Sequence, residues 1–94
     1  MSEMASLRAT VHGRVQGVFF RDSTRRFAEE HHLAGYARNT ADTTVVEVVA
    51  EGDRKRLEAM VDFLRQGPPA ARVDSVDIEW ADYTGRFAGF STRS

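Results

Sequence analysis

The residues of this chain that are best placed to do chemistry lie between an apolar strand and the helix that follows it. The segment Gly13-Arg14-Val15-Gln16-Gly17-Val18-Phe19-Phe20-Arg21 contains the end of a predicted strand, a bend at Gly17 and the start of a predicted helix near Phe20. Such a bend leaves backbone N–H groups unpaired beside the positive end of the helix dipole. Arg21 adds a planar guanidinium that matches two oxygens of one phosphate. The residue types therefore favour binding of an oxyanion, above all a phosphoryl group.

A second interpretation of the same segment is purely structural. Gly17 would then only form a turn, and Arg21 would only cover the surface of the helix. The local residues leave both interpretations open, because a single loop that contains glycine is weak evidence for a ligand.

The segment resembles the first motif of the acylphosphatases, a family of small enzymes that hydrolyse acyl phosphates. The second motif of that family is also present, as Gly35-Tyr36-Ala37-Arg38-Asn39. The resemblance begins at about Leu7 and continues through three further stretches, Val48-Val49-Ala50-Glu51-Gly52, Gly67-Pro68-Pro69 and Phe87-Ala88-Gly89-Phe90. It implies a hydrolase that releases a carboxylate and inorganic phosphate from a small acyl phosphate.

The resemblance also implies roles for individual residues. Arg21 matches the family's phosphate-binding arginine, and Asn39 matches the asparagine that holds and orients the attacking water. Backbone amides are expected to complete the phosphate cradle, namely those of Gln16, Gly17, Val18, Phe19 and Phe20. A side-chain amide suits the water-holding task because its carbonyl accepts a hydrogen bond without titrating near neutral pH. We expect no cofactor and no bound metal, since the chain shows no convincing set of metal ligands.

Hydrophobic periodicity predicts the elements that must position these residues. Helices are predicted over 21–33 and from Asp53, a suitable N-cap, to Gly67 at the C-cap. Alternating or β-branched residues predict five strands. They cover about 7–15, 36–39, 44–50, 73–80 with a bulge near its start, and 87–92. We expect Trp80 and the phenylalanines to lie in the core.

The first six of these elements follow the order β-α-β-β-α-β, which predicts an α+β class and a ferredoxin-like split β-α-β sandwich. Its sheet would be largely antiparallel, with two helices on one face. We expect residues 1–6 to form a flexible N-terminal extension and residues 7–94 to form a single domain. The turn after Asn39 lacks the glycine that many acylphosphatases carry there, so a longer loop or a bulge is expected around Asp42-Thr43-Thr44.

Composition excludes several classes of function. Ninety-four residues suffice for one modest core, and the absence of cysteine excludes disulfides and thiolate catalysis. A formal net charge of −1 gives no reason to expect nucleic acid or anionic lipid as a partner. No apolar run approaches the length of a membrane span, and the first residues lack a secretory pattern. We therefore expect a cytoplasmic monomer that binds a small molecule.

Three alternatives share the predicted fold. An RNA-recognition module would stack bases on aromatic side chains of its central strands, but the strand over 45–49 carries none. A carrier of a soft metal would need thiolates, which this chain lacks. A non-catalytic relative of the acylphosphatases that only senses an anion is left open by the sequence.

Two groups of charged or titratable residues also have a plain structural interpretation. His31 and His32 are adjacent on a predicted helix, so their side chains point about 100° apart and do not face one ion together. Packing for one and solvent for the other is expected. Three arginines, Arg14, Arg25 and Arg26, either raise the potential at the mouth of the site or simply keep the surface solvated.

Overall fold

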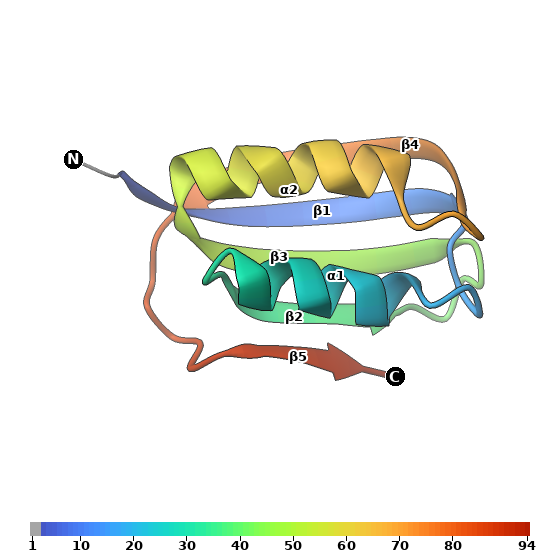
Figure 1. The fold of residues 1–94 in the computed structure, drawn as a ribbon, viewed down its shortest axis with the longest axis horizontal. Coiled ribbons are helices and arrows are strands. Elements are labelled where there is room, and N and C mark those ends of the chain that lie inside the picture. Colours follow the sequence, from blue (N-terminus) through green and yellow to red (C-terminus); the bar gives the residue numbers. More distant parts are fainter. Residues whose placement is uncertain (1–2) are drawn as a thin grey trace.

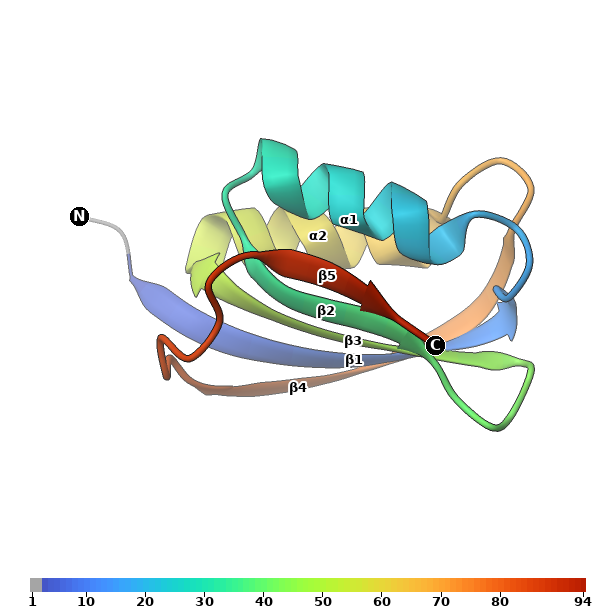
Figure 2. The ribbon, with the colours of Figure 1, turned by 90° about the horizontal axis from the view of Figure 1, so that it is seen from below.

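In the computed structural model, which describes residues 3–94, two helices cover one face of a five-stranded sheet (Figures 1 and 2). The elements in chain order are β1 (Met4–Arg14), α1 (Phe20–Glu30), β2 (Ala34–Asn39), β3 (Val45–Asp53), α2 (Arg54–Gln66), β4 (Arg72–Asp82) and β5 (Phe90–Arg93). The strand order is β4-β1-β3-β2-β5, and only the β2–β5 pair is parallel among the pairs of this sheet in residues 3–94. This arrangement confirms the predicted ferredoxin-like fold.

Strand alternation places the core between the sheet and the helices. In β1, Leu7, Ala9 and Val11 are at most 1% exposed, while Arg8 between them is exposed. Opposite them in β3 stand three equally buried residues, Ala50, Val48 and Val46. A one-residue slip would turn every one of these side chains to the uncovered face, so burial fixes the register.

Each helix buries the apolar face that hydrophobic periodicity predicts. The fully buried residues are Phe20, Thr24 and Ala28 in α1 and Leu57, Met60 and Leu64 in α2. Helix α1 ends at Glu30, three residues before the predicted end at Leu33. Beyond that end, His31 stacks on Phe27 with 3.9 Å between ring centroids, and His32 is exposed, as expected for a pair that does not share an ion. Within residues 3–94, neither helix is long and apolar enough to cross a membrane.

The N-terminal boundary differs from the prediction. Strand β1 begins at Met4, and residues 4–6 pair with residues 51–53 of β3. The carbonyl of Glu3 accepts a 2.7 Å hydrogen bond from the amide of Arg54, the first residue of α2. The predicted flexible extension is therefore wrong for residues 4–6, and residues 1–2 lie outside the described residues. Asp53 does occupy the N-cap position of α2, but its side chain makes no capping hydrogen bond.

Two aromatic side chains expected in the core lie at the surface. Trp80 is 36% exposed because β4 is an edge strand, and the guanidinium of Arg54 lies 3.6 Å from its ring centroid. Phe19 is 79% exposed. The bulge expected early in the fourth strand is confirmed. His12 pairs with Ser75 and Gly13 pairs with Val73, which leaves one residue of β4 without a partner in the ladder.

Candidate active site

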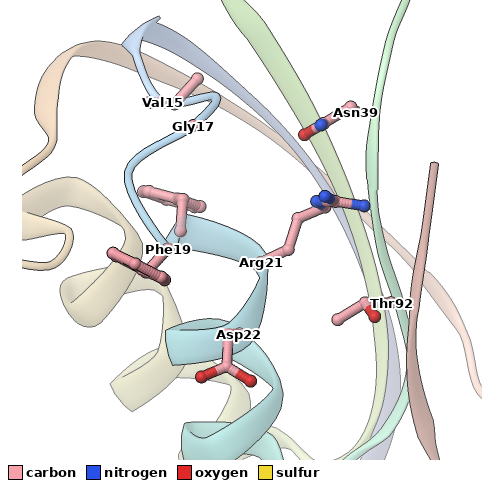
Figure 3. A pocket seen from close by; sticks show the side chains of 8 residues that line it. Val15, Gly17, Phe19, Arg21, Asp22, Asn39 and Thr92 are labelled. Carbon is pink, nitrogen blue, oxygen red and sulfur yellow. The ribbon is translucent and has the colours of Figure 1, made fainter.

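An open pocket of about 280 Å³ lies where the N-terminus of α1 meets the ends of β2 and β5 (Figure 3). Its lining consists of Val15, Gly17, Phe19, Phe20, Arg21, Asp22, Asn39 and Thr92. Figure 3 shows the side chains of Arg21, from α1, and Asn39, from β2, pointing into the same space. The structure therefore brings together the two side chains that the motifs single out.

The loop between β1 and α1 is fixed by side chains that enter the core on either side of its glycine. Val15 and Val18 are 1% and 6% exposed, and Gly17 between them has φ 73°. A Cβ at Gly17 would meet no atom within 4 Å, so its backbone conformation, and not lack of space, favours glycine. Among residues 3–94, the amides of residues 16–19 find no hydrogen-bond acceptor. Such free donors are available to an anion, and the phosphate cradle predicted for the amides of residues 16–20 stays a prediction.

Arg21 is held in place by a contact with strand β5. Its Nη1 donates a 2.7 Å hydrogen bond to the backbone carbonyl of Arg93 in β5. Since β5 pairs in parallel with β2, the same strand brings Thr92 to the wall of the pocket. A guanidinium has five N–H donors, so this contact orients Arg21 and leaves donors for a ligand. Neither the position of Thr92 nor that of the Arg93 carbonyl was predicted from the sequence.

Asn39 is the last residue of β2 and pairs with Val46 of β3. Its side-chain oxygen Oδ1 is buried and has no hydrogen-bond partner among the described residues. Leaving a buried polar atom unpaired costs about 1–3 kcal/mol, so nearly all such atoms find a donor. The Oδ1 of Asn39 is therefore suited to accept a hydrogen bond from a ligand or from a water molecule near the guanidinium of Arg21.

The side chain of Gln16 joins the cradle loop to the hairpin that follows Asn39. Its Nε2 lies 3.2 Å from the carbonyl oxygen of Thr40, 3.0 Å from that of Asp42 and 2.9 Å from that of Val45. This amide fixes the β2–β3 loop against the loop that would hold the phosphate. The sequence predicts a role only for the backbone amide of Gln16, because no local pattern indicates a contact between residues so far apart in the chain.

The β2–β3 loop covers residues 40–44 and forms without the glycine turn. The carboxylate of Asp42 accepts hydrogen bonds from the Thr44 amide at 2.9 Å and from its hydroxyl at 2.6 Å. These two bonds, led by the one from the hydroxyl, lower the pKa of Asp42 below its ordinary value. The longer loop expected here is confirmed, and the pairing of β2 with β3 is regular throughout.

Asp22 lines the pocket, but its charge is matched by neighbouring arginines. The Asp22 carboxylate lies 2.7 Å from Arg25 and 3.1 Å from Arg26, and Arg25 also contacts Glu29 at 2.7 Å. The hydrogen bond from Arg25 is the main cause that lowers the pKa of Asp22. In Figure 3 the Asp22 side chain points away from Arg21. Arg25 and Arg26 thus pair with carboxylates on the helix surface, as the plain structural interpretation expects.

The part of the chain that the structure describes contains no group of three or more His, Asp or Glu side chains that could hold a metal ion. The pocket is lined by a guanidinium, a side-chain amide, backbone N–H groups and a hydroxyl, together with the Asp22 carboxylate that Arg25 and Arg26 pair. Such a set binds an anion and orients a neutral nucleophile beside it. The fold and the pocket together define a small α+β domain with a loop of free backbone N–H groups beside an arginine.

Comparison with known proteins identifies the family of this domain. The family model described as acylphosphatase matches residues 7–92. An acylphosphatase of Dehalococcoides mccartyi is 49% identical over 87 residues, which cover 93% of this chain and 96% of that protein. One of Pelotomaculum thermopropionicum is 50% identical over 86 residues, which cover 92% of each chain. The solved structure of an acylphosphatase from Coxiella burnetii superposes with a TM-score of 0.89 at 38% identity and covers 96% of this chain and 93% of that chain.

The chain belongs to the acylphosphatase family. This membership confirms the resemblance that the two motifs carry, and it supports a hydrolase that acts on acyl phosphates.

Proposed function

We propose that this chain hydrolyses acyl phosphates by in-line attack of a water molecule that is held by Asn39. The phosphoryl group would be bound by Arg21 and by the backbone amides of residues 16–20. The observation that carries this proposal is the buried, unpartnered Oδ1 of Asn39 next to the guanidinium of Arg21. One group accepts a hydrogen bond and the other supplies positive charge, which are the two demands of water attack on a phosphate.

The proposed reaction needs little acid–base catalysis. An acyl phosphate is a mixed anhydride, and its cleavage expels a carboxylate whose conjugate acid has a pKa of about 4, so no strong general acid is needed. Phosphoryl transfer passes through a loose transition state in which positioning and charge stabilisation dominate. The proposal is supported by the groups that line the pocket, since Arg21 would supply donors and Asn39 an acceptor for this work.

The proton of the attacking water needs an acceptor. The amide of Asn39 is a poor base, and Asp22 is paired with Arg25 and Arg26 and points away from Arg21. We therefore assign this role to an oxygen of the substrate's own phosphoryl group. The product side then consists of a carboxylate and inorganic phosphate, with no covalent intermediate on the protein.

The alternative of an RNA-recognition module finds no support in the sheet. Its central strands, β1 and β3, carry no phenylalanine, tyrosine or tryptophan on which a base would stack. Action as a monomer in the cytoplasm and independence from metal stay predictions.

The experiment that tests the proposed function is hydrolysis of benzoyl phosphate in the presence of EDTA. We expect turnover by the wild type and a fall in kcat of about a hundredfold in Asn39→Ala, with a smaller change in KM, because the lost contact belongs to the attacking water. Thr43→Ala, in the exposed part of the same hairpin, is the matched control and should keep its activity.

A folded wild type that binds phosphate without turnover would contradict the proposal. It would favour a relative that senses an anion. A requirement for added metal would contradict the metal-free mechanism while leaving the substrate class intact.

A further inference from the structure

Phe19 carries two features that cost stability. Its ring is 79% exposed, so its large apolar surface contributes little to the core. Its backbone has φ 63° and ψ 22°, the left-handed region that bulky residues rarely adopt. Strained backbone of this kind persists only where its surroundings impose it, and it gathers at functional sites. Packing of the Phe19 ring itself explains neither feature.

The neighbours of Phe19 impose its position. Val18 on one side is 6% exposed and Phe20 on the other is 1% exposed, so both side chains are anchored in the core. The residue between them is the N-cap of α1, and its ring is left at the surface. Phe19 lines the pocket that also contains Arg21 and Asn39. The fold therefore places an exposed aromatic ring at the mouth of the site.

The ring does not belong to a larger apolar surface. The other large hydrophobic side chains that are exposed among residues 3–94 are Met4, Trp80 and Tyr83. All three lie at one end of the sheet, where the start of β1 pairs with the end of β4. Phe19 follows the opposite end of β1. An isolated ring beside a pocket fits a small ligand better than a docking protein.

The geometry of in-line transfer indicates what would reach the ring. The attacking and leaving oxygens lie on opposite sides of the phosphorus atom. In Figure 3, Asn39 comes from β2 and Phe19 comes from the loop before α1, so the two residues line different walls of the pocket. If the water is held at the wall that β2 forms, the acyl group leaves away from that wall, toward the part of the pocket that the loop with Phe19 lines. We propose that the Phe19 ring packs against the acyl group of the substrate and makes this chain selective for acyl phosphates whose acyl group is flat and apolar, above all aromatic.

This inference rests on the proposed function, and the test keeps the two apart. The measurement is kcat/KM for benzoyl phosphate and for acetyl phosphate, whose acyl group is too small to cover the ring. Phe19→Asn removes the ring and tolerates the left-handed conformation, while Phe19→Tyr keeps the ring. Differences in leaving-group chemistry between the two substrates cancel when the ratio of the two kcat/KM values is compared between proteins.

We expect the ratio of benzoyl to acetyl phosphate to fall about three- to tenfold in Phe19→Asn, mostly through KM, as expected for an aromatic contact. Phe19→Tyr should retain the wild-type ratio. A loss that is equal for both substrates, or no change for either, would show that Phe19 only shapes the loop and would overturn the inference alone. Failure of the wild type to hydrolyse either substrate would overturn the proposed function, and this inference with it.

Discussion

The Nη1 of Arg21 donates a 2.7 Å hydrogen bond to the backbone carbonyl of Arg93, so the phosphate-binding candidate on α1 is oriented by the last strand of the sheet. This contact joins two residues that are 72 positions apart in the sequence. It exists because β5 runs parallel to β2 beside the pocket, where its residue Thr92 also forms part of the wall. Positioning of the guanidinium therefore depends on an edge strand.

Removal of residues 91–94 is expected to weaken phosphate binding without unfolding the domain. Phe90, which is 9% exposed and belongs to the core, stays in place, while the Arg93 carbonyl and Thr92 are lost. A hydrogen bond to a charged group contributes about 1.5–3 kcal/mol, and part of that would appear as a roughly tenfold rise in Ki for inorganic phosphate. Removal of Ser94 alone, which lies beyond β5, is the control. Equal Ki values for the two truncated proteins would refute this role for β5.

Gln16 is expected to position Asn39 without touching the substrate through its side chain. Its amide lies within 3.2 Å of three carbonyl oxygens of the hairpin loop, so Gln16→Glu keeps the shape but places a carboxylate against three acceptors. We expect kcat to fall about tenfold in Gln16→Ala and further in Gln16→Glu, since small displacements of positioned groups are costly. Gln66→Ala, at the exposed end of α2, is the control. If Gln16→Glu were as active as Gln16→Ala, repulsion from the carbonyl groups would not matter.

The sequence predicted the parts of the site that are local. The strand, the bend at Gly17 and the start of the helix lie within a few residues of one another, and their pattern depends on short-range sterics and periodicity. Arg21 and Asn39 came from motif resemblance, and the structure brings both to one pocket. The five predicted strands and two helices all exist, with ends shifted by a few residues.

The parts that the sequence did not predict depend on contacts between distant segments. The side chain of Gln16 reaches a hairpin that begins after Asn39, and Arg21 reaches a carbonyl of β5. Hydrophobic periodicity in the sequence does not predict either contact. The exposure of Trp80 was not predicted either. The alternation of apolar residues in its strand predicts a core position, but the strand lies at the edge of the sheet. Which strand is an edge strand is decided by topology and not by local pattern.

Glu51 is expected to make the fold sensitive to acid. Its side chain is buried and accepts hydrogen bonds from the amide and hydroxyl of Thr84, at 3.2 and 2.8 Å, and from the amide of Gly85 at 3.0 Å. Burial alone would raise the pKa of Glu51, but these bonds and one from Ser6 outweigh it, so the pKa lies below the ordinary value of 4.5. The unfolded chain then takes up the proton first as the pH falls. The stability that Glu51 contributes is present above pH 4.5 and is lost as the pH falls through its folded pKa.

Glu51→Gln tests this dependence. At pH 7 the variant should lose about 1–3 kcal/mol of unfolding free energy, because an amide group replaces a carboxylate that accepts hydrogen bonds from Thr84, Gly85 and Ser6. Between pH 7 and pH 3 the difference between wild type and variant should shrink, since the other carboxylates titrate alike in both proteins. Glu30→Gln, on an exposed position, should give a pH profile parallel to that of the wild type. A difference that stays constant down to pH 3 would mean that Glu51 is not the titrating group.

Phe19→Gly is expected to leave the stability of the domain intact or to increase it slightly. Release of the left-handed strain would gain about 1–2 kcal/mol, and the greater freedom of glycine in the unfolded chain would take back about 0.5–1 kcal/mol. The exposed ring has little burial to lose. Phe20→Ala, which removes a ring that is 1% exposed, should instead cost about 3–5 kcal/mol. Urea unfolding with unchanged m-values measures both. A loss above about 1 kcal/mol in Phe19→Gly would show that the ring packs against the domain, whereas unchanged stability with lost selectivity would mean that the residue is retained for the substrate.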